Sequence, residues 1–322
     1  MTLPSADSSR PQQLVVLGTG GTIAGNAASA TDATGYRAAE RGIEELIAAL
    51  PALEGLRIET EQVAQIDSKN MSIAIWQRLA RVLAMHLARP EVGGIVVTHG
   101  SDTLEETAYL LQRVLAPSKP VVLTAAMRPA TSLQADGPQN LLDAIIVAAT
   151  AGTSGVLAVV AGRIWSGLEL RKVHVLQLDA FDAGDAGPIG AVEDGRIRLW
   201  RPMPAGAPLG LARIERESSG WPRVEIIASH AGSDGAIVDA VLAKPQPTPL
   251  AGLVVAGTGN ATLHAELEAA LWRAQAAGVR VWRCSRTGAG PVIVHDERIP
   301  AVSLTPWQAR VALQLELLEG ET

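Results

Sequence analysis

Short apolar runs alternate along the chain with longer segments whose apolar residues recur at helical spacing. The short runs are apolar throughout, which is typical of strands buried on both faces of a sheet. We predict strands at Leu14–Leu17, Gly94–Thr98, Val121–Thr124, Val156–Val160 and Leu253–Ala256, and helices at Ser72–Ala88, Thr103–Leu115, Pro138–Ala149 and Thr262–Ala277. This alternation predicts an α/β fold with a mostly parallel sheet flanked by helices.

A segment rich in Pro, Gly and charge, residues 200–221, interrupts the alternation. We interpret it as a connection between two domains of unequal size. The predicted organisation is a large N-terminal domain over residues 1–205, a linker over 206–222, and a smaller C-terminal α/β domain over 223–322. Near the end of the chain, Thr305 followed by Pro306 predicts the N-cap and first residue of a helix.

Three turns, at residues 15–22, 96–103 and 254–262, place glycine, a hydroxyl and a polar side chain directly after a predicted strand. In open α/β sheets, ligands bind at the carboxyl ends of the strands. We therefore expect the three turns to meet at one sheet edge. The alternative for each turn alone is that Gly and Thr form a tight turn and a helix cap.

Charge and composition exclude several classes of protein. The net charge is −6, with 27 Lys and Arg against 33 Asp and Glu, which disfavours a nucleic-acid or anionic membrane surface. A single cysteine, Cys284, rules out an internal disulfide framework. The start is polar and no apolar run is long enough to span a membrane. We expect a soluble, cytoplasmic protein.

Common catalytic and nucleotide-binding motifs do not fit the chain. At the first turn, Gly18 and Gly20 match a dinucleotide fingerprint, but Ile23 stands where the third glycine is needed. This disfavours a nicotinamide dehydrogenase. The phosphate-loop, G-x-S-x-G and H-E-x-x-H patterns are missing from the sequence. We interpret His99 as an orienting or packing residue and Cys284 as a packing residue.

The remaining polar segments resemble the bacterial-type L-asparaginases. The resemblance rests on "TGGTIAG" (19–25) and "VVTHGSDTLEETAYLL" (96–111), continues in "KPVVLTAAMRPATSLQADGPQNLLDA" (119–144), and reaches "AGTGN" (256–260). It covers nearly the whole chain. It implies hydrolysis of L-asparagine to L-aspartate and ammonia through an acyl-enzyme ester, with no metal or organic cofactor.

By position, the resemblance implies that Thr22 is the nucleophile. We expect the glycines flanking it to leave N–H groups free for an oxyanion. The polar segment 26–39, which the sequence predicts as a lid or a disordered loop, carries Tyr36, the matching tyrosine. The second implied catalytic group is Ser101, Asp102 and Lys172. The family usually has threonine where Ser101 stands, and a solvated surface role for Lys172 is the alternative.

The resemblance also implies substrate contacts. Ser68 matches a residue that holds the α-carboxylate, and Asp102 matches one that binds the α-ammonium. The position after Ser68 is commonly Gln or Glu in the family and is Lys69 here, a cation that either holds the carboxylate or turns to solvent. Gly100 and Ala126 match backbone positions that line the pocket.

The family assembles as dimers of intimate dimers, so the resemblance implies a homotetramer whose sites are completed by a neighbouring subunit. Asn260 matches the start of the turn that reaches the neighbour's site, although the later Asn of that turn is Thr262 here. Glu297 is a weak candidate for the acid from the neighbour. Three alternatives stay open: a glutaminase or broader amidohydrolase, an ammonia-supplying subunit of a tRNA-amidating enzyme, and a non-catalytic amino-acid sensor.

Overall fold

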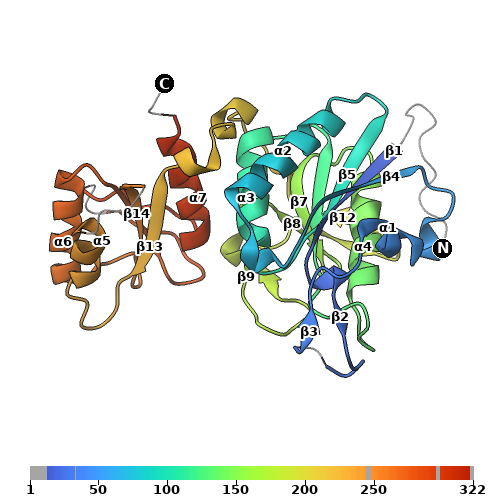
Figure 1. The fold of residues 1–322 in the computed structure, drawn as a ribbon, viewed down its shortest axis with the longest axis horizontal. Helices are drawn as coiled ribbons and strands as arrows, with labels where there is room; N and C mark the ends of the chain where they lie inside the picture. The colour runs from blue at the N-terminus through green and yellow to red at the C-terminus, as the bar shows by residue number, and fades with distance from the viewer. Residues whose placement is uncertain (1–12, 33, 244–247, 295–297, 320–322) are drawn as a thin grey trace. The chain divides into compact units, whose positions relative to one another are not determined.

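The computed structural model describes residues 13–32, 34–243, 248–294 and 298–319 (Figure 1). The chain divides into two compact units, Met1–Leu211 and Ala212–Thr322. The boundary between the units lies inside the segment that the sequence predicts as a linker, and Glu297 lies outside the described residues.

One eight-stranded sheet organises the N-terminal unit. Its strands are β1 (Gln13–Gly20), β4 (Ile58–Ile66), β5 (Val92–Thr98), β6 (Pro120–Thr124), β7 (Gly155–Val160), β8 (Arg163–Ser166), β11 (Gly190–Glu193) and β12 (Arg196–Leu199), in the order β12-β11-β8-β7-β6-β5-β1-β4. From β4 to β7 the neighbours are parallel, and β8, β11 and β12 continue the sheet antiparallel. The sheet is therefore mostly parallel, as predicted.

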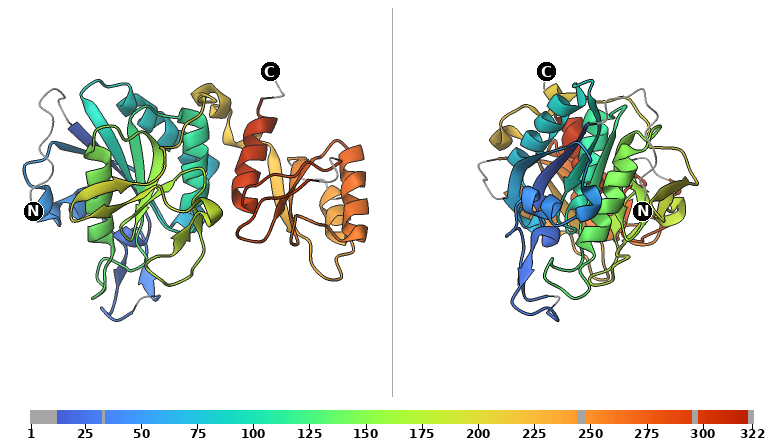
Figure 2. Two further views of the ribbon diagram at one scale, coloured as in Figure 1. Left: turned by 180° about the vertical axis from the view of Figure 1, so that it is seen from behind. Right: turned by 90° about the vertical axis from the view of Figure 1, so that its right-hand side faces the viewer.

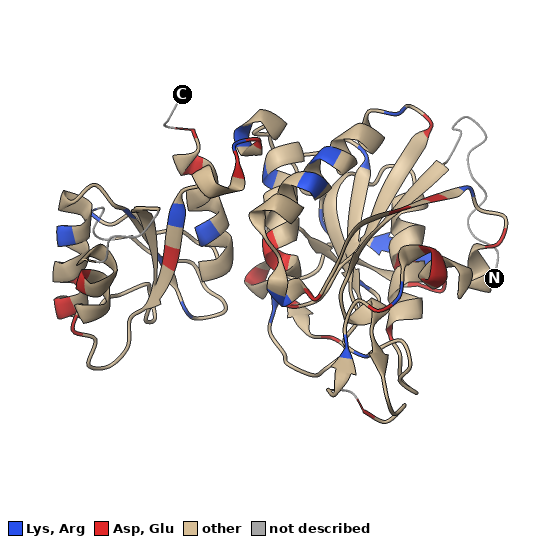
Figure 3. Cartoon of the chain, in the orientation of Figure 1, with Lys and Arg blue, Asp and Glu red and all other residues tan. Residues whose placement is uncertain are grey.

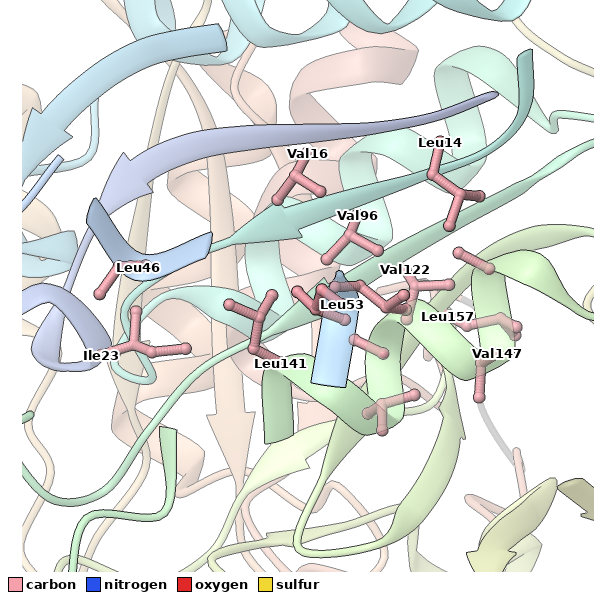
Figure 4. Packing of buried hydrophobic residues seen from close by; sticks show 14 of the residues in the cluster. Leu14, Val16, Ile23, Leu46, Leu53, Val96, Val122, Leu141, Val147 and Leu157 are labelled. Atoms are coloured by element: carbon pink, nitrogen blue, oxygen red, sulfur yellow. The ribbon is translucent and has the colours of Figure 1, made fainter. Parts of the chain in front are cut away.

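Helices cover both faces of this sheet (Figures 1 and 2). They are α1 (Ile43–Ala48), α2 (Ile73–Leu87), α3 (Leu104–Leu115) and α4 (Gly137–Ala149). Val16 of β1, Val96 of β5 and Val122 of β6 point from one face, and Leu141 and Val147 of α4 pack against them (Figure 4). The central strands β5, β6 and β7 are almost entirely apolar, because both faces of the sheet are covered there.

The strand order creates a specific place for a ligand. The chain passes from β1 to β4 on one side, and from there to β5 on the other side of β1. The neighbouring strands β1 and β5 are thus left by connections that run in opposite directions. In doubly wound sheets a crevice forms outside the carboxyl ends of such a strand pair. The turns after Gly20 and after Thr98 both lie at this point.

The C-terminal unit has its own sheet and core. Three parallel strands, in the order β13-β14-β15, are β13 (Arg223–Ala228), β14 (Leu250–Gly257) and β15 (Arg280–Ser285), and the helices are α5 (Ala236–Ala243), α6 (Ala265–Ala276) and α7 (Pro306–Leu317). Thr305 caps α7, and Gln308 completes a capping box with it. The smaller α/β domain predicted from the sequence is therefore present. Its last helix begins at Pro306 after the Thr305 N-cap, as predicted.

Short elements complete the described chain. Two-residue strands pair as β2 (Asn26–Ala27) with β3 (Tyr36–Arg37) and as β9 (Arg171–Lys172) with β10 (Phe181–Asp182). The 3₁₀ helices are η1 (Thr22–Ala24), η2 (Pro51–Leu53), η3 (Ser68–Asn70), η4 (Gly184–Ala186), η5 (Leu211–Ile214) and η6 (Ser218–Gly220). Segment 26–39, predicted as a lid or a disordered loop, contains the short β2–β3 hairpin, and its role as a lid stays a prediction.

Basic and acidic side chains are interspersed over the elements of each unit (Figure 3). None of the helices that the structure describes combines the length and the apolar character that a bilayer crossing requires.

Candidate active site

Thr22 lies in the first turn after β1. This turn lies where the connections that leave β1 and β5 run in opposite directions, a point that we call the β1–β5 switch. Gly20 and Gly21 precede it with φ of 102° and 83°, which glycine adopts without strain. A Cβ at Gly21 would lie 2.5 Å from both the Cα and the N of Gly100. The glycine therefore lets the turn that carries Thr22 contact the turn after β5 directly, and the Thr22 side chain is mostly buried at this contact.

The hydroxyl of Thr22 is hydrogen-bonded to the hydroxyl of Tyr36, with 2.7 Å between the two oxygens. Tyr36 is brought there by the β2–β3 hairpin, in which it pairs with Ala27. The chain then returns to the first turn, because the Ala39 N–H donates to the Gly21 carbonyl at 3.0 Å. The structure thus brings these two predicted site residues together through a hairpin that the sequence did not predict.

The turn after β5 carries the second predicted cluster. Lys172 Nζ donates to Ser101 Oγ at 2.9 Å and to Asp102 Oδ1 at 2.7 Å. Ser101 is buried, whereas 53% of the Asp102 side chain is exposed, so its carboxylate can still meet a ligand. The three predicted residues lie together, and Lys172 is not a solvated surface lysine, since only 21% of its side chain is exposed.

Glu105 is a residue of this cluster that the sequence analysis missed. It lies in the first turn of α3, and its Oε2 accepts a hydrogen bond from the backbone N–H of Lys172 at 2.9 Å. Desolvation by burial raises the pKa of the Glu105 carboxyl to about 7. Its partner is a backbone N–H 67 residues further along the chain, so no local spacing in the sequence indicated it.

The buried His99 side chain supports the turn after β5 through hydrogen bonds at both ring nitrogens. Its Nδ1 lies 2.7 Å from the Gly100 carbonyl and its Nε2 lies 3.0 Å from Thr107 Oγ1. The Thr107 hydroxyl oxygen accepts from Trp76 Nε1 at 2.8 Å. Complete burial lowers the pKa of His99 to about 4. The ring is therefore neutral, and its partners assign the proton to Nδ1. This arrangement agrees with an orienting role.

Ser68 lies beneath the turn that carries Asp102. Its Oγ accepts from the Asp102 N–H at 3.2 Å, and its carbonyl accepts from Thr103 Oγ1 at 2.9 Å. Lys69 turns to solvent, with 67% of its side chain exposed, and pairs with Asp67 at 2.9 Å. The hydrogen bond to Asp67, and then its charge, raise the pKa of Lys69. Of the two sequence-based options for Lys69, the structure has the exposed one.

Gly100 and Ala126 are both buried next to the site. Gly100 faces the Cα of Gly21 and the side chain of Ser68. The Ala126 side chain belongs to the hydrophobic core, so only its backbone is available to a ligand. Each was expected to offer its backbone.

The C-terminal unit holds the remaining predicted residue, Asn260, in the turn after β14. Its Nδ2 donates to the Ile293 carbonyl at 2.7 Å, and its Oδ1 accepts from the Ile293 N–H at 2.6 Å. The third glycine-rich turn therefore follows a strand of the separate three-stranded sheet, and the expectation that all three turns share one sheet edge is wrong. Only the turns after β1 and β5 share it.

The N–H groups of two glycines that flank Thr22 are not free, contrary to the expectation from the sequence. The Gly21 N–H donates to the Ile66 carbonyl at 2.8 Å, and the Gly25 N–H donates to the Thr22 carbonyl at 2.9 Å. The expectation from sequence was therefore wrong for both flanking glycines. Their role here is to permit positive φ and close approach, because the hydrogen-bonding capacity of their N–H groups is already used.

Among the described residues, the structure holds no group of three or more His, Cys, Asp or Glu side chains arranged for a metal ion. Cys284 is buried, and burial raises the pKa of its thiol to about 12. A thiol in that state is not an activated nucleophile. The polar chemistry at the β1–β5 switch therefore rests on hydroxyls, two carboxyls and a lysine.

Comparisons with known proteins agree with this arrangement. Residues 13–204 match the family model "Asparaginase, N-terminal", and residues 223–322 match "Glutaminase/Asparaginase C-terminal domain". The chain is 34% identical to L-asparaginase 2 of Bacillus subtilis, over 94% of this chain and 81% of the relative. It is also 34% identical to L-asparaginase 2 of Escherichia coli (95% and 89%) and to the glutaminase-asparaginase of Pseudomonas fluorescens biotype A (96% and 87%).

The same relationship holds in three dimensions. The crystal structure of a probable cytoplasmic L-asparaginase from Campylobacter jejuni matches with a TM-score of 0.88 and 36% sequence identity, and the match covers 97% of this chain and 96% of that one. With both family models matched in order along the described sheets, the chain belongs to the asparaginase family.

Proposed function

We propose that this protein hydrolyses L-asparagine to L-aspartate and ammonia through an ester on Thr22. The observation that carries the proposal is the pair of turns at the β1–β5 switch. One turn presents the Thr22 hydroxyl hydrogen-bonded to Tyr36, and the neighbouring turn presents Ser101 and Asp102 bonded to Lys172. A hydroxyl nucleophile with a second polar group beside it is what acyl transfer needs. Several relatives named as L-asparaginases support the substrate.

The reaction proceeds in two balanced steps. Thr22 Oγ1 bonds to the side-chain amide carbon, the carbon–nitrogen bond breaks, and the hydroxyl proton passes to the leaving nitrogen, so ammonia departs. Water then attacks the ester, and its second proton restores the Thr22 hydroxyl as aspartate leaves. We assign proton handling to Tyr36, which shares a hydrogen bond with Thr22, and to the cluster of Ser101, Asp102 and Lys172.

Substrate orientation follows from the groups around Asp102. The exposed carboxylate of Asp102 binds the α-ammonium, because a charge-assisted hydrogen bond there is strong. The Ser68 hydroxyl accepts from the Asp102 N–H and keeps its own proton for the α-carboxylate. The backbones of Gly100 and Ala126 form the wall of the pocket.

Glutamine is the second candidate substrate. Relatives from Pseudomonas fluorescens and Pseudomonas aeruginosa are named glutaminase-asparaginase. An ammonia-release assay with asparagine, glutamine and an isoaspartyl dipeptide side by side separates the candidates, and a comparable rate on all three would mean a broader amidohydrolase.

We also propose a homotetramer, built as a dimer of dimers, in which a neighbouring subunit completes each site through the turn that begins at Asn260. An exposed aliphatic stretch supports association: Val173, Val175, Leu176 and Leu178 follow Lys172 directly and are 37–79% exposed. The cytoplasmic location is likewise a proposal, supported by the probable cytoplasmic L-asparaginase of Campylobacter jejuni.

The decisive experiment replaces Thr22. Thr22→Ala removes the attacking oxygen, so ammonia release from asparagine should fall on the order of 10³-fold or more while asparagine still binds, as calorimetry would measure. Thr22→Ser is the matched control because it keeps the hydroxyl and should keep most activity. Wild-type turnover by Thr22→Ala would end the mechanism.

A further inference from the structure

Lys172 occupies a weakly supported piece of chain. Its strand, β9, has two residues and pairs with the two residues of β10 in a sheet of its own. The residues that follow are largely exposed, with 53% of Val173 and 79% of Val175 accessible. A two-residue ladder fixes little on its own. The Val173 N–H, which donates to the Ala180 carbonyl at 2.8 Å, extends the pairing by one residue. A further contact must fix the Lys172 backbone itself so that the lysine ammonium reaches the turn after β5.

The start of α3 holds Lys172 at both ends. The Nζ of Lys172 contacts Ser101 and Asp102, and its backbone N–H donates to Glu105 Oε2 at 2.9 Å. Ser101, Asp102 and Glu105 all lie within five consecutive residues of the chain. Together these hydrogen bonds close a ring. The ring runs from the turn after β5, through the side chain and backbone of Lys172, to Glu105 in the first turn of α3.

The burial of the Glu105 carboxyl costs folding free energy. Only 5% of Glu105 is exposed, and burying a carboxyl removes it from water. Desolvation is the largest cause of its raised pKa, and the nearby charge of Glu106 acts in the same direction. The hydrogen bond from the Lys172 N–H, and then the charges of Arg171 and Lys172, act against it. A methionine of similar volume would fill the same space without that cost.

We propose that Glu105 is a positioning residue, which fixes the backbone of Lys172 so that the lysine ammonium stays against Ser101 and Asp102. The inference rests on the function proposed above, because it gives Lys172 its part in proton handling. Glu105 itself is not assigned a contact with the substrate or with Thr22. Its effect passes through one hydrogen bond to the backbone of Lys172.

Three variants isolate that bond. Glu105→Met keeps the volume and removes the acceptor oxygen, and Glu105→Gln keeps an acceptor oxygen without the charge. Glu106→Met is the matched control on the next residue of the helix. Glu105→Met should lower kcat for asparagine by about 10- to 100-fold, because a displaced proton-handling group loses its geometry, with KM within about threefold. Glu105→Gln and Glu106→Met should keep kcat within about fivefold of wild type.

A second readout does not depend on turnover. Acetylation of surface amines, followed by peptide mass mapping, compares the labelling rate of Lys172 with that of the exposed Lys69 in the same sample. Releasing Lys172 in Glu105→Met should raise the Lys172:Lys69 ratio by about tenfold, the fold-change expected from losing one hydrogen bond. In Glu105→Gln and Glu106→Met the ratio should match wild type.

The two readouts separate two kinds of failure. If wild-type protein releases no ammonia from any amide, the proposed function fails, while the labelling ratio still tests the positioning role. If Glu105→Met folds, as circular dichroism would show, and leaves both kcat and the labelling ratio unchanged, the positioning role is overturned. If Glu105→Met does not fold, Glu105→Gln decides the question. Because that variant retains the acceptor oxygen, a raised Lys172:Lys69 labelling ratio in it would overturn the positioning role.

Discussion

Two buried ionisable side chains near the site, His99 and Glu105, are displaced from their ordinary pKa in opposite directions. Burial lowers the pKa of His99 from 6.5 to about 4 and raises that of Glu105 from 4.5 to about 7. Between pH 4.5 and pH 6.5, His99 is protonated and Glu105 is ionised in the unfolded chain, whereas both side chains are neutral in the folded chain. His99 thus makes folding more favourable as pH rises, Glu105 makes it less favourable, and the two effects oppose each other.

Replacing the ionisable Glu105 should therefore change how the free energy of unfolding depends on pH. Glu105→Gln cannot ionise, so its free energy of unfolding relative to wild type should rise by up to about 3 kcal/mol between pH 4.5 and pH 7, at about 1.4 kcal/mol per pKa unit. Urea unfolding at pH 4.5, 5.5 and 7 measures the difference between variant and wild type. A difference that does not change with pH would contradict the assignment of a buried, neutral Glu105 in the acid range.

Lys69 gives a prediction about substrate binding. Its charge acts on Asp102 and opposes the approach of an α-ammonium to that carboxylate, while Asp67 partly neutralises it. Lys69→Gln should lower KM for asparagine by about three- to tenfold with kcat nearly unchanged, and Asp67→Asn should raise KM. Because both charges are exposed, the effects should shrink as salt is raised from 20 to about 500 mM. Initial rates at the two salt concentrations test this, and salt-independent effects would argue against an electrostatic origin.

Single residues differ in how far the sequence reveals them. Thr22, Ser101 and Asp102 lie in glycine-rich turns directly after buried strands, so their position at the sheet edge could be predicted from the pattern. Lys172 could be proposed only from the family resemblance, since no local pattern ties "RK" to a turn 70 residues earlier. Glu105 was missed because its partner is a backbone N–H, which leaves no mark in the sequence.

At the scale of elements, the turn from β1 into η1 depends on a glycine for two separate reasons. Gly21 has φ of 83° and also approaches the backbone of Gly100. Gly55 has a similar φ of 87°, but a Cβ there would meet nothing within 4 Å. The two glycines therefore separate backbone strain from steric overlap.

Replacing each by alanine should give different results. Gly55→Ala should cost about 1 kcal/mol of stability through positive φ alone and leave turnover unchanged. Gly21→Ala should cost several kcal/mol in total, because the turns after β1 and β5 must also move apart, and turnover should fall with it. Thermal unfolding and ammonia release test the pair. Equal losses in the two variants would show that the contact between Gly21 and Gly100 does not matter.

Elements were predictable where they are buried on both faces. β5, β6 and β7 and the helices α2, α3 and α4 were all indicated by apolar runs or helical spacing, and their ends differ by a few residues. β4, at the sheet edge, mixes Glu and Gln with apolar residues and was not indicated. The two-residue strands β2, β3 and β9 carry no period at all, because they exist only through pairing and side-chain contacts made after the chain folds.

At the scale of the whole molecule, the order of strands decides where chemistry can occur. Because β1 lies between β4 and β5, two polar turns distant in sequence come together, while the similar turn after β14 belongs to another sheet. The alternation of strands and helices predicted the fold class, but the order of strands within a sheet is not contained in local periodicity. That is why the prediction succeeded for two turns and failed for the third.

The proposed association of whole molecules would use an exposed aliphatic surface next to Lys172. The exposed stretch Val173–Leu178 begins one residue after Lys172, so a second copy of the chain that covered it would also shield the lysine from water. Val175, 79% exposed, is the most accessible of its four aliphatic side chains. If the proposed oligomer uses this stretch, Val175→Asp should dissociate it, as sedimentation velocity would measure, and lower ammonia release in parallel, since a charge buried in an interface is costly. Met85→Asp, which changes an exposed apolar residue of α2, is the control and should retain wild-type mass and rate. Val175→Asp with unchanged mass and rate would show that this stretch is free in solution and that the site does not need a neighbour there.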